Sequence, residues 1–190
     1  KVEELAPLAS PIEIIQGQSY ETKLDFIDIP PLPRQMFISQ DARNIIQIQR
    51  DRFIFNWRKL ELNDTYPRYE KVFNEFKDKL GKFNSFLENS QMRVVPVQYE
   101  LTYVNQIEEN DLWKNNNDLI NIFPTFQSKI ENGLILEEPE TVNSRISFLL
   151  PNKMGRLHAT IKTGAIRKAN NKKVIILDLT VRGFNGKNLT

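Results

Sequence analysis

The 190-residue chain contains no cysteine, and this absence excludes disulfide bonds, thiolate metal sites and a cysteine nucleophile. Because a chain without disulfides suits a reducing compartment, we predict a cytoplasmic protein. The single histidine cannot supply the two or three imidazole ligands that catalytic zinc sites commonly use. No apolar run approaches the roughly 20 residues needed to cross a bilayer, so we expect no membrane association.

An excess of charge of one sign is also missing. The sequence has 26 lysines and arginines against 24 acidic residues, which gives a net charge of +2. The overall field therefore would not draw the chain onto nucleic acid, and such binding would need a local patch. No phosphate loop, dinucleotide fingerprint, nucleophile elbow or metal-ligand spacing occurs. We accordingly predict no cofactor and no metal, and we lean against an enzyme.

The residues that are present predict a folded chain with β-strands near its start. Hydrophobic residues make up 40% and aromatic residues 10% of the sequence, as in globular proteins. Residues 1–34 are rich in proline, which predicts an extended lead-in with one strand over residues 20–28. Residues 35–58 then contain three alternating runs, QMFIS, NIIQIQ and FIFNWR, which predict an antiparallel meander.

Residues 66–90 show helical periodicity, with apolar side chains at steps of three and four. Asp64 or Thr65 is the predicted helix cap, and Pro67 suits the first turn. We expect the apolar stripe of this helix to cover the dry face of the strand before it. That face consists of Phe53, Phe55 and Trp57.

The second half of the chain repeats these kinds of element. A long strand is predicted over residues 92–107, with Pro96 weakening its early half. A shorter helix follows over residues 110–123, capped by Asn110 or Asp111, and an acidic loop comes next. A second meander completes the pattern with SRISFLLP, GRLHATIKTG and KVIILDLTVRG, each of which alternates between polar and apolar residues.

This order predicts an α+β protein with two antiparallel β-meander units and helices packed on one face of each. The succession of meander, helix, strand, helix and meander suggests a pseudo-duplication. We predict a lead-in over residues 1–34, a first unit over 35–107 and a second over 108–190, within one compact body.

Two segments carry a family resemblance. The pattern Q-x-Q-x-D-R-F-x-x-N-W-R, followed by a proline–tyrosine helix start and then E-x-T-Y-V-N, resembles a sporadically distributed family of uncharacterised prokaryotic proteins. The matching residues are Gln47, Gln49, Asp51, Arg52, Phe53, Asn56, Trp57, Arg58, Pro67, Arg68, Tyr69, Glu100, Thr102, Tyr103, Val104 and Asn105. The family has no established activity, so the resemblance implies the domain but no catalytic residues. It also implies further residues before Lys1 and after Thr190.

The polar faces of the predicted strands supply the candidate binding residues. They are Arg52, Asn56, Arg58, Glu100, Arg145, Arg156, His158, Lys162 and Arg182. A competing interpretation is that Glu100, Asp51 and Asp178 pair with the arginines, so that these faces hold the chain or a partner together. His158 is better interpreted as a hydrogen-bonded strand residue than as a catalytic base.

Three functional hypotheses remain. The leading one is a non-enzymatic module that binds a protein partner or a second copy of itself, in a prokaryotic stress or phage-defence system. The alternative is nucleic-acid or nucleotide binding through the basic polar face, which predicts a steep dependence on salt. A weaker third hypothesis is a cavity between sheet and helix that holds a small apolar ligand.

Overall fold

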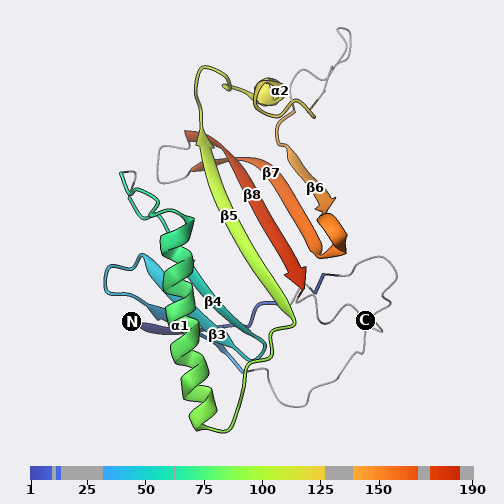
Figure 1. Ribbon diagram of the computed structural model, residues 1–190. Coiled ribbons are helices and arrows are strands. Elements are labelled where there is room, and N and C mark those ends of the chain that lie inside the picture. Colours follow the sequence, from blue (N-terminus) through green and yellow to red (C-terminus); the bar gives the residue numbers. More distant parts are fainter. Residues whose placement is uncertain (10–11, 14–31, 62, 127–138, 167–171, 185–190) are drawn as a thin grey trace. The chain divides into compact units, whose positions relative to one another are not determined.

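The computed structural model describes residues 1–9, 12–13, 32–61, 63–126, 139–166 and 172–184 (Figure 1). The chain is α+β with two antiparallel meander sheets, as predicted from the sequence, and each sheet has four strands. It divides into two compact units. The first comprises Lys1–Ile12 and Ser19–Val95, and the second comprises Glu13–Gln18 and Pro96–Thr190.

The sheet of the first unit is a simple antiparallel meander in the order β1-β2-β3-β4. Its strands are β1 (Val2–Leu5), β2 (Arg34–Ile38), β3 (Asn44–Gln49) and β4 (Arg52–Trp57). The three predicted strands of this meander are confirmed. A fourth strand, β1, comes from within the predicted lead-in, whereas the strand expected over residues 20–28 lies outside the described residues.

The long amphipathic helix α1 (Tyr69–Asn89) contacts β4 through aromatic side chains. The ring of Phe53 lies 6.1 Å from that of Phe76 and 5.3 Å from that of Phe83, centroid to centroid. Because these two phenylalanines belong to the predicted apolar stripe, the expected contact between helix and strand is confirmed at Phe53. Such aromatic pairs add about 0.5–1.5 kcal/mol beyond the burial of their area.

The predicted start of α1 is wrong. Its N-cap is Arg68, whose φ of 72° turns the chain into the helix and whose side chain makes no capping hydrogen bond. Pro67 therefore lies outside the first turn, and neither Asp64 nor Thr65 is the cap. The carboxylate of Asp64 accepts instead from Arg43 at 2.6 Å and from two backbone N–H groups of the preceding turn. These contacts hold the pKa of Asp64 well below its usual range.

The second unit contains the antiparallel sheet β5-β8-β7-β6. Its strands are β5 (Gln98–Glu108), β6 (Asn143–Leu149), β7 (Gly155–Ile166) and β8 (Lys172–Phe184). The predicted second meander, β6 to β8, is confirmed. Strand β5 begins only after Pro96 and pairs with β8 along its whole length, which differs from its expected grouping with the first meander. Figure 1 shows β5 beside β8.

The second predicted helix is much shorter than expected. Helix α2 (Leu119–Ile122) follows a single 3-10 turn, and the chain before that turn is irregular. The side chain of Asn115 caps the turn, and the carboxylate of Asp118 accepts from the Asn115 backbone N–H at 3.1 Å. The predicted caps Asn110 and Asp111 are therefore wrong. Short polar side chains that bond the local backbone compete with helix formation, which explains the difference.

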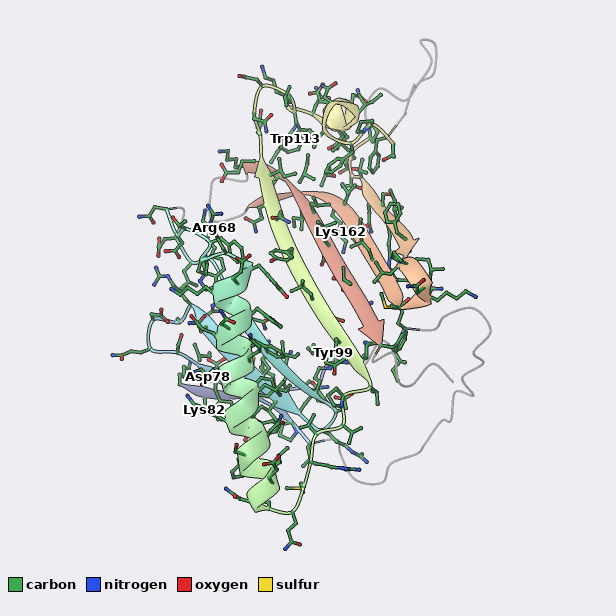
Figure 2. The ribbon with its side chains drawn as sticks, in the orientation of Figure 1. Arg68, Asp78, Lys82, Tyr99, Trp113 and Lys162 are labelled. Carbon is green, nitrogen blue, oxygen red and sulfur yellow. The ribbon has the colours of Figure 1, made fainter. Side chains whose placement is uncertain are left out.

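The dry face of the second sheet meets its most buried core near α2. Trp113 is 1% exposed and packs with Leu119, Ile161 and Ile175, which are also buried. Figure 2 shows Trp113 close to α2. Because Ile161 lies on β7 and Ile175 on β8, this cluster fixes the irregular segment before α2 against the sheet.

Candidate functional site

The opposite face of the second sheet carries its polar side chains in cross-strand rows. The strand register places Ser147, His158, Thr180 and Thr102 opposite one another in one row. Arg156, Arg182 and Glu100 form the neighbouring row. We call this surface the polar face. Its members are Gln98, Glu100, Thr102, Arg145, Ser147, Arg156, His158, Thr160, Lys162, Asp178, Thr180 and Arg182.

A carboxylate from much earlier in the sequence lies on the polar face. Oε1 of Glu13 accepts a hydrogen bond from Nη1 of Arg156 at 2.6 Å, and Oε2 accepts from Nε2 of His158 at 2.8 Å. Nη1 of Arg182 lies 3.9 Å from Oε2. The backbone N–H of Glu13 donates to Oε1 of Gln98 at 2.9 Å. Each carboxylate oxygen therefore has a donor of its own.

This environment keeps Glu13 ionised although the residue is only 7% exposed. Burial alone would raise the pKa of its carboxyl group, because a charge loses hydration there. Hydrogen bonds from Arg156 and His158 outweigh burial, so the pKa of Glu13 lies below its usual range. The site thus compensates a buried negative charge, as buried charges in proteins require.

The hydrogen bonds of His158 define its neutral tautomer. Nδ1 lies 3.1 Å from Nη2 of Arg145 and 2.8 Å from Oγ of Ser147. Because a guanidinium group can only donate, Nδ1 acts as the acceptor. The ring proton is then on Nε2, where it is donated to Glu13. His158, a residue that is 7% exposed, has its ring held from both sides.

Ser147, His158 and Glu13 are hydrogen-bonded in series, as are the hydroxyl, imidazole and carboxylate of a catalytic triad. A general base needs a lone pair that is free to take the hydroxyl proton. Here Arg145 also donates to that lone pair, and Arg156 neutralises the carboxylate that would stabilise an imidazolium. The arrangement is therefore better suited to holding an anion than to proton transfer.

The neighbouring polar side chains are also paired. Nε of Arg182 donates to Oε2 of Glu100 at 2.6 Å, which is one of the pairings expected from the sequence. The hydroxyl groups of Thr180 and Thr102 are 3.0 Å apart, and Thr180 donates to Asp178 at 2.8 Å. Asp178 is thus bonded to a threonine in place of the expected arginine.

Two cations at the β6–β7 side of the face remain exposed. Arg145 and Lys162 both have exposed side chains, and no ion pair joins Lys162 to another residue that the structure describes. Lys162 lies on β7 of the second sheet (Figure 2). They leave this side of the polar face with a net positive charge that is open to solvent.

Six of the nine candidate residues lie on the polar face, and the other three belong to the first unit. The six are Glu100, Arg145, Arg156, His158, Lys162 and Arg182. In the first unit, Arg52 donates to the carbonyl of Ala9 at 3.2 Å, and Arg58 donates to that of Ala42 at 2.8 Å. Asn56 is half-buried on β4. The two arginines therefore bind backbone carbonyls of other segments in the first unit.

Sequence reasoning missed Glu13. The residue stands in the proline-rich lead-in, outside any alternating segment. One signal was present, because Glu13 is the sole charged residue between positions 6 and 20. A lone carboxylate in an otherwise uncharged stretch must be solvated or paired when the chain folds.

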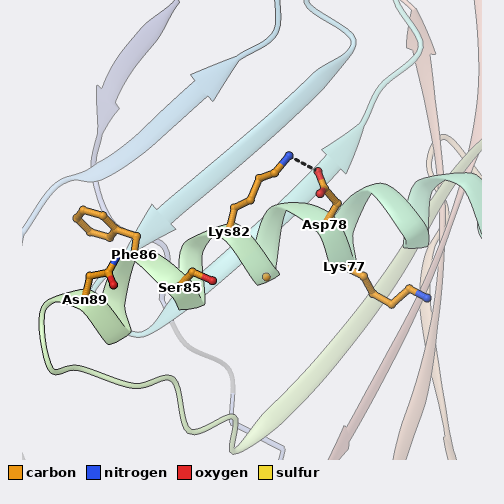
Figure 3. A pocket seen from close by; sticks show the side chains of 7 residues that line it. Lys77, Asp78, Lys82, Ser85, Phe86 and Asn89 are labelled. Atoms are coloured by element: carbon orange, nitrogen blue, oxygen red, sulfur yellow. Dashed lines mark hydrogen bonds and ion pairs between the residues drawn. The ribbon is translucent and has the colours of Figure 1, made fainter.

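A second feature, a shallow hollow along α1, offers no comparable site. Its lining residues, including Lys77, Asp78 and Lys82, all come from one helix (Figure 3). Asp78 binds Lys82 across one helical turn at 2.9 Å. In the described parts of the chain, no three histidine or acidic side chains gather to hold a metal ion. No described helix is long and apolar enough to span a membrane.

Compared with protein-family models, with curated proteins and with solved structures, the chain matches none. Its function must therefore be inferred from the geometry of the polar face.

Proposed function

We propose that the chain is a protein-binding module that holds its partner, another protein or a second copy of itself, on the polar face. The observation that carries this proposal is the pair of carboxylates already held there. Arg156 and His158 bind Glu13, and Arg182 binds Glu100, all at hydrogen-bond distance. A face built from such donors suits the carboxylates and backbone carbonyls of a polypeptide.

The charge pattern favours a protein over nucleic acid. Binding to phosphates relies on free lysines and arginines, whose contacts release counterions. On the polar face, Arg156 and Arg182 are already neutralised by glutamates. Phe184 is the sole phenylalanine, tyrosine or tryptophan among the paired strand positions of this face, so stacking of successive bases has little support.

Nucleic-acid binding is kept as the second candidate because of Arg145 and Lys162. Their exposed side chains project from the same side of the face and are available for phosphate contacts. The two candidates differ in their response to salt, which weakens phosphate contacts steeply. A setting in prokaryotic stress or phage defence rests on the family resemblance and stays a prediction.

A pulldown from the native host tests the proposal. Three baits are compared, each with and without nuclease and at low and high salt: the wild type, Arg145→Glu/Lys162→Glu, and the control Lys77→Glu/Lys82→Glu. The control makes the same charge change on exposed positions of α1. We expect to recover a partner protein in equal amounts with and without nuclease. Its recovery should fall about tenfold or more with Arg145→Glu/Lys162→Glu and should not fall with the control.

Two results would contradict the proposal. Recovery of nucleic acid that salt removes would favour the second candidate. Equal recovery of the partner by the wild type and the polar-face variant would place the interface elsewhere.

A further inference from the structure

We propose that Arg156, His158 and Arg182 form a binding site for an acidic side chain of the partner, and that Glu13 occupies this site in the unbound chain. We call the three residues the carboxylate site. The inference rests on the proposed function and adds the chemistry of the partner: a segment with an aspartate or glutamate. It also adds a competition between that segment and Glu13.

Two of the three residues of the carboxylate site, His158 and Arg182, are held in place by partners other than Glu13. His158 is buried, and its ring is fixed by Arg145 and Ser147 on the side away from the carboxylate. Arg182 is fixed by its bond to Glu100. Donors that are held in place beforehand bind a ligand at a smaller cost in entropy. His158 and Arg182 would therefore keep their positions when Glu13 leaves.

Glu13 is held by the kind of contacts that allow a ligand to exchange. It lies outside the β-strands, and the described hydrogen bonds of both its backbone N–H and its carboxylate go to side chains. The preceding residue, Ile12, is 52% exposed. Side-chain contacts of this kind, without strand pairing of the residue that makes them, open at a lower free energy than a paired strand. An internal ligand that occupies the site lowers the apparent affinity for the partner in proportion to its occupancy.

The geometry favours a carboxylate over a phosphate. The two oxygens of Glu13 meet separate donors, Arg156 and His158, in the arrangement that a planar carboxylate offers. His158 provides one proton, and Glu100 adds a negative charge beside Arg182.

The test uses the chain's own segment as a probe in trans. A labelled peptide with the sequence of residues 7–18, PLASPIEIIQGQ, is titrated into the wild type, Glu13→Gln and Glu13→Ala. Glu109→Ala is the matched control, because it removes an exposed carboxylate from the same unit. A second peptide carries Gln in place of the glutamate. The imidazole signals of His158, the single histidine, report binding by NMR.

We expect both Glu13 variants to bind the acidic peptide about tenfold or more tightly than the wild type and the control. The glutamine peptide should lose most of this gain, and the His158 signals should move with the acidic peptide alone. Adding Arg156→Ala to Glu13→Ala should abolish the gain.

Several results would overturn the inference. Equal affinity of all four proteins would show that Glu13 does not compete, and unfolding of both Glu13 variants would make Glu13 a structural residue. A matching response of His158 to inorganic phosphate would show a general anion site. The pulldown tests the proposed function separately. If the proposed function were wrong, the Arg145→Glu/Lys162→Glu variant would still recover the partner, and this result does not depend on the peptide titration.

Discussion

His158 donates a 2.8 Å hydrogen bond to Glu13 across 145 positions of sequence. Both side chains are buried, and the contact joins the start of the chain to the middle of the second sheet. Because a buried carboxylate must be paired, this contact links the stability of the second unit to the charge of the polar face.

Acid should destabilise the second unit through Glu13. Its pKa is lower in the folded chain than in the unfolded chain, so its contribution to stability is present above the unfolded pKa, which is about 4. The contribution is lost as the pH falls through the lower, folded pKa. We expect the free energy of unfolding to decrease below about pH 4. Urea titrations followed by Trp113 fluorescence, in a Trp57→Phe background, measure it.

The matched variant for this acid effect is Glu13→Gln. It should be less stable than the wild type at neutral pH by about 1–2 kcal/mol, because Arg156 loses its charged partner. The difference between the two proteins should shrink as the pH falls. A constant difference would show that the charge of Glu13 does not stabilise the unit.

Trp113 should be the most sensitive single position of the described core. Trp113→Ala leaves a large cavity beside Leu119 and Ile175 and should cost about 3–5 kcal/mol of unfolding free energy. Trp113→Phe should cost less, because Nε1 is buried and no described group accepts its proton. Trp57→Ala, at a half-buried position, is the control and should also cost less. Denaturant titration of each variant measures these losses.

Two glycines should respond in opposite ways to the same substitution. Gly155 begins β7 with a φ of 156°, and a Cβ there would collide with the carbonyl oxygen of Arg182 and lie 2.7 Å from Cα of Gly183. Gly155→Ala should therefore destabilise the chain by about 3 kcal/mol or more. Gly81 lies within α1 with open space around it, so Gly81→Ala should stabilise it by about 0.5–1 kcal/mol. Thermal melts measure both effects. A change in melting temperature in the same direction for both variants would contradict this account.

Local patterns predicted most elements of the fold and fewer of their pairings. Alternation located β2 to β4 and β6 to β8, and helical spacing located α1, because each pattern lies within one segment. The partner of β5 is β8, more than 60 positions later, and no local pattern encodes such a pairing. The N-terminus of α1 was predicted wrongly because Asp64, a residue type that often caps helices, is bound to Arg43 instead.

The site was predictable only where it lies on strands. Alternation placed Arg156, His158 and Arg182 on one face, and antiparallel pairing then brought them together. Glu13 was not predicted as a site residue because it lies outside the periodic segments. Arg52 and Arg58 were included because exposed polarity on a strand does not distinguish a binding residue from one that tethers a loop.

The most direct test of the polar face as the interface is the reactivity of its lysine. Lys162, Lys77 and Lys82 are all exposed, so a brief pulse of an acylating reagent should modify each in the free chain. The same pulse is then applied to the chain bound to the partner that the pulldown recovers. Our account predicts that acylation of Lys162 falls about tenfold, whereas acylation of Lys77 and Lys82 on α1 stays unchanged. Unchanged reactivity of Lys162, or protection of the α1 lysines alone, would contradict it.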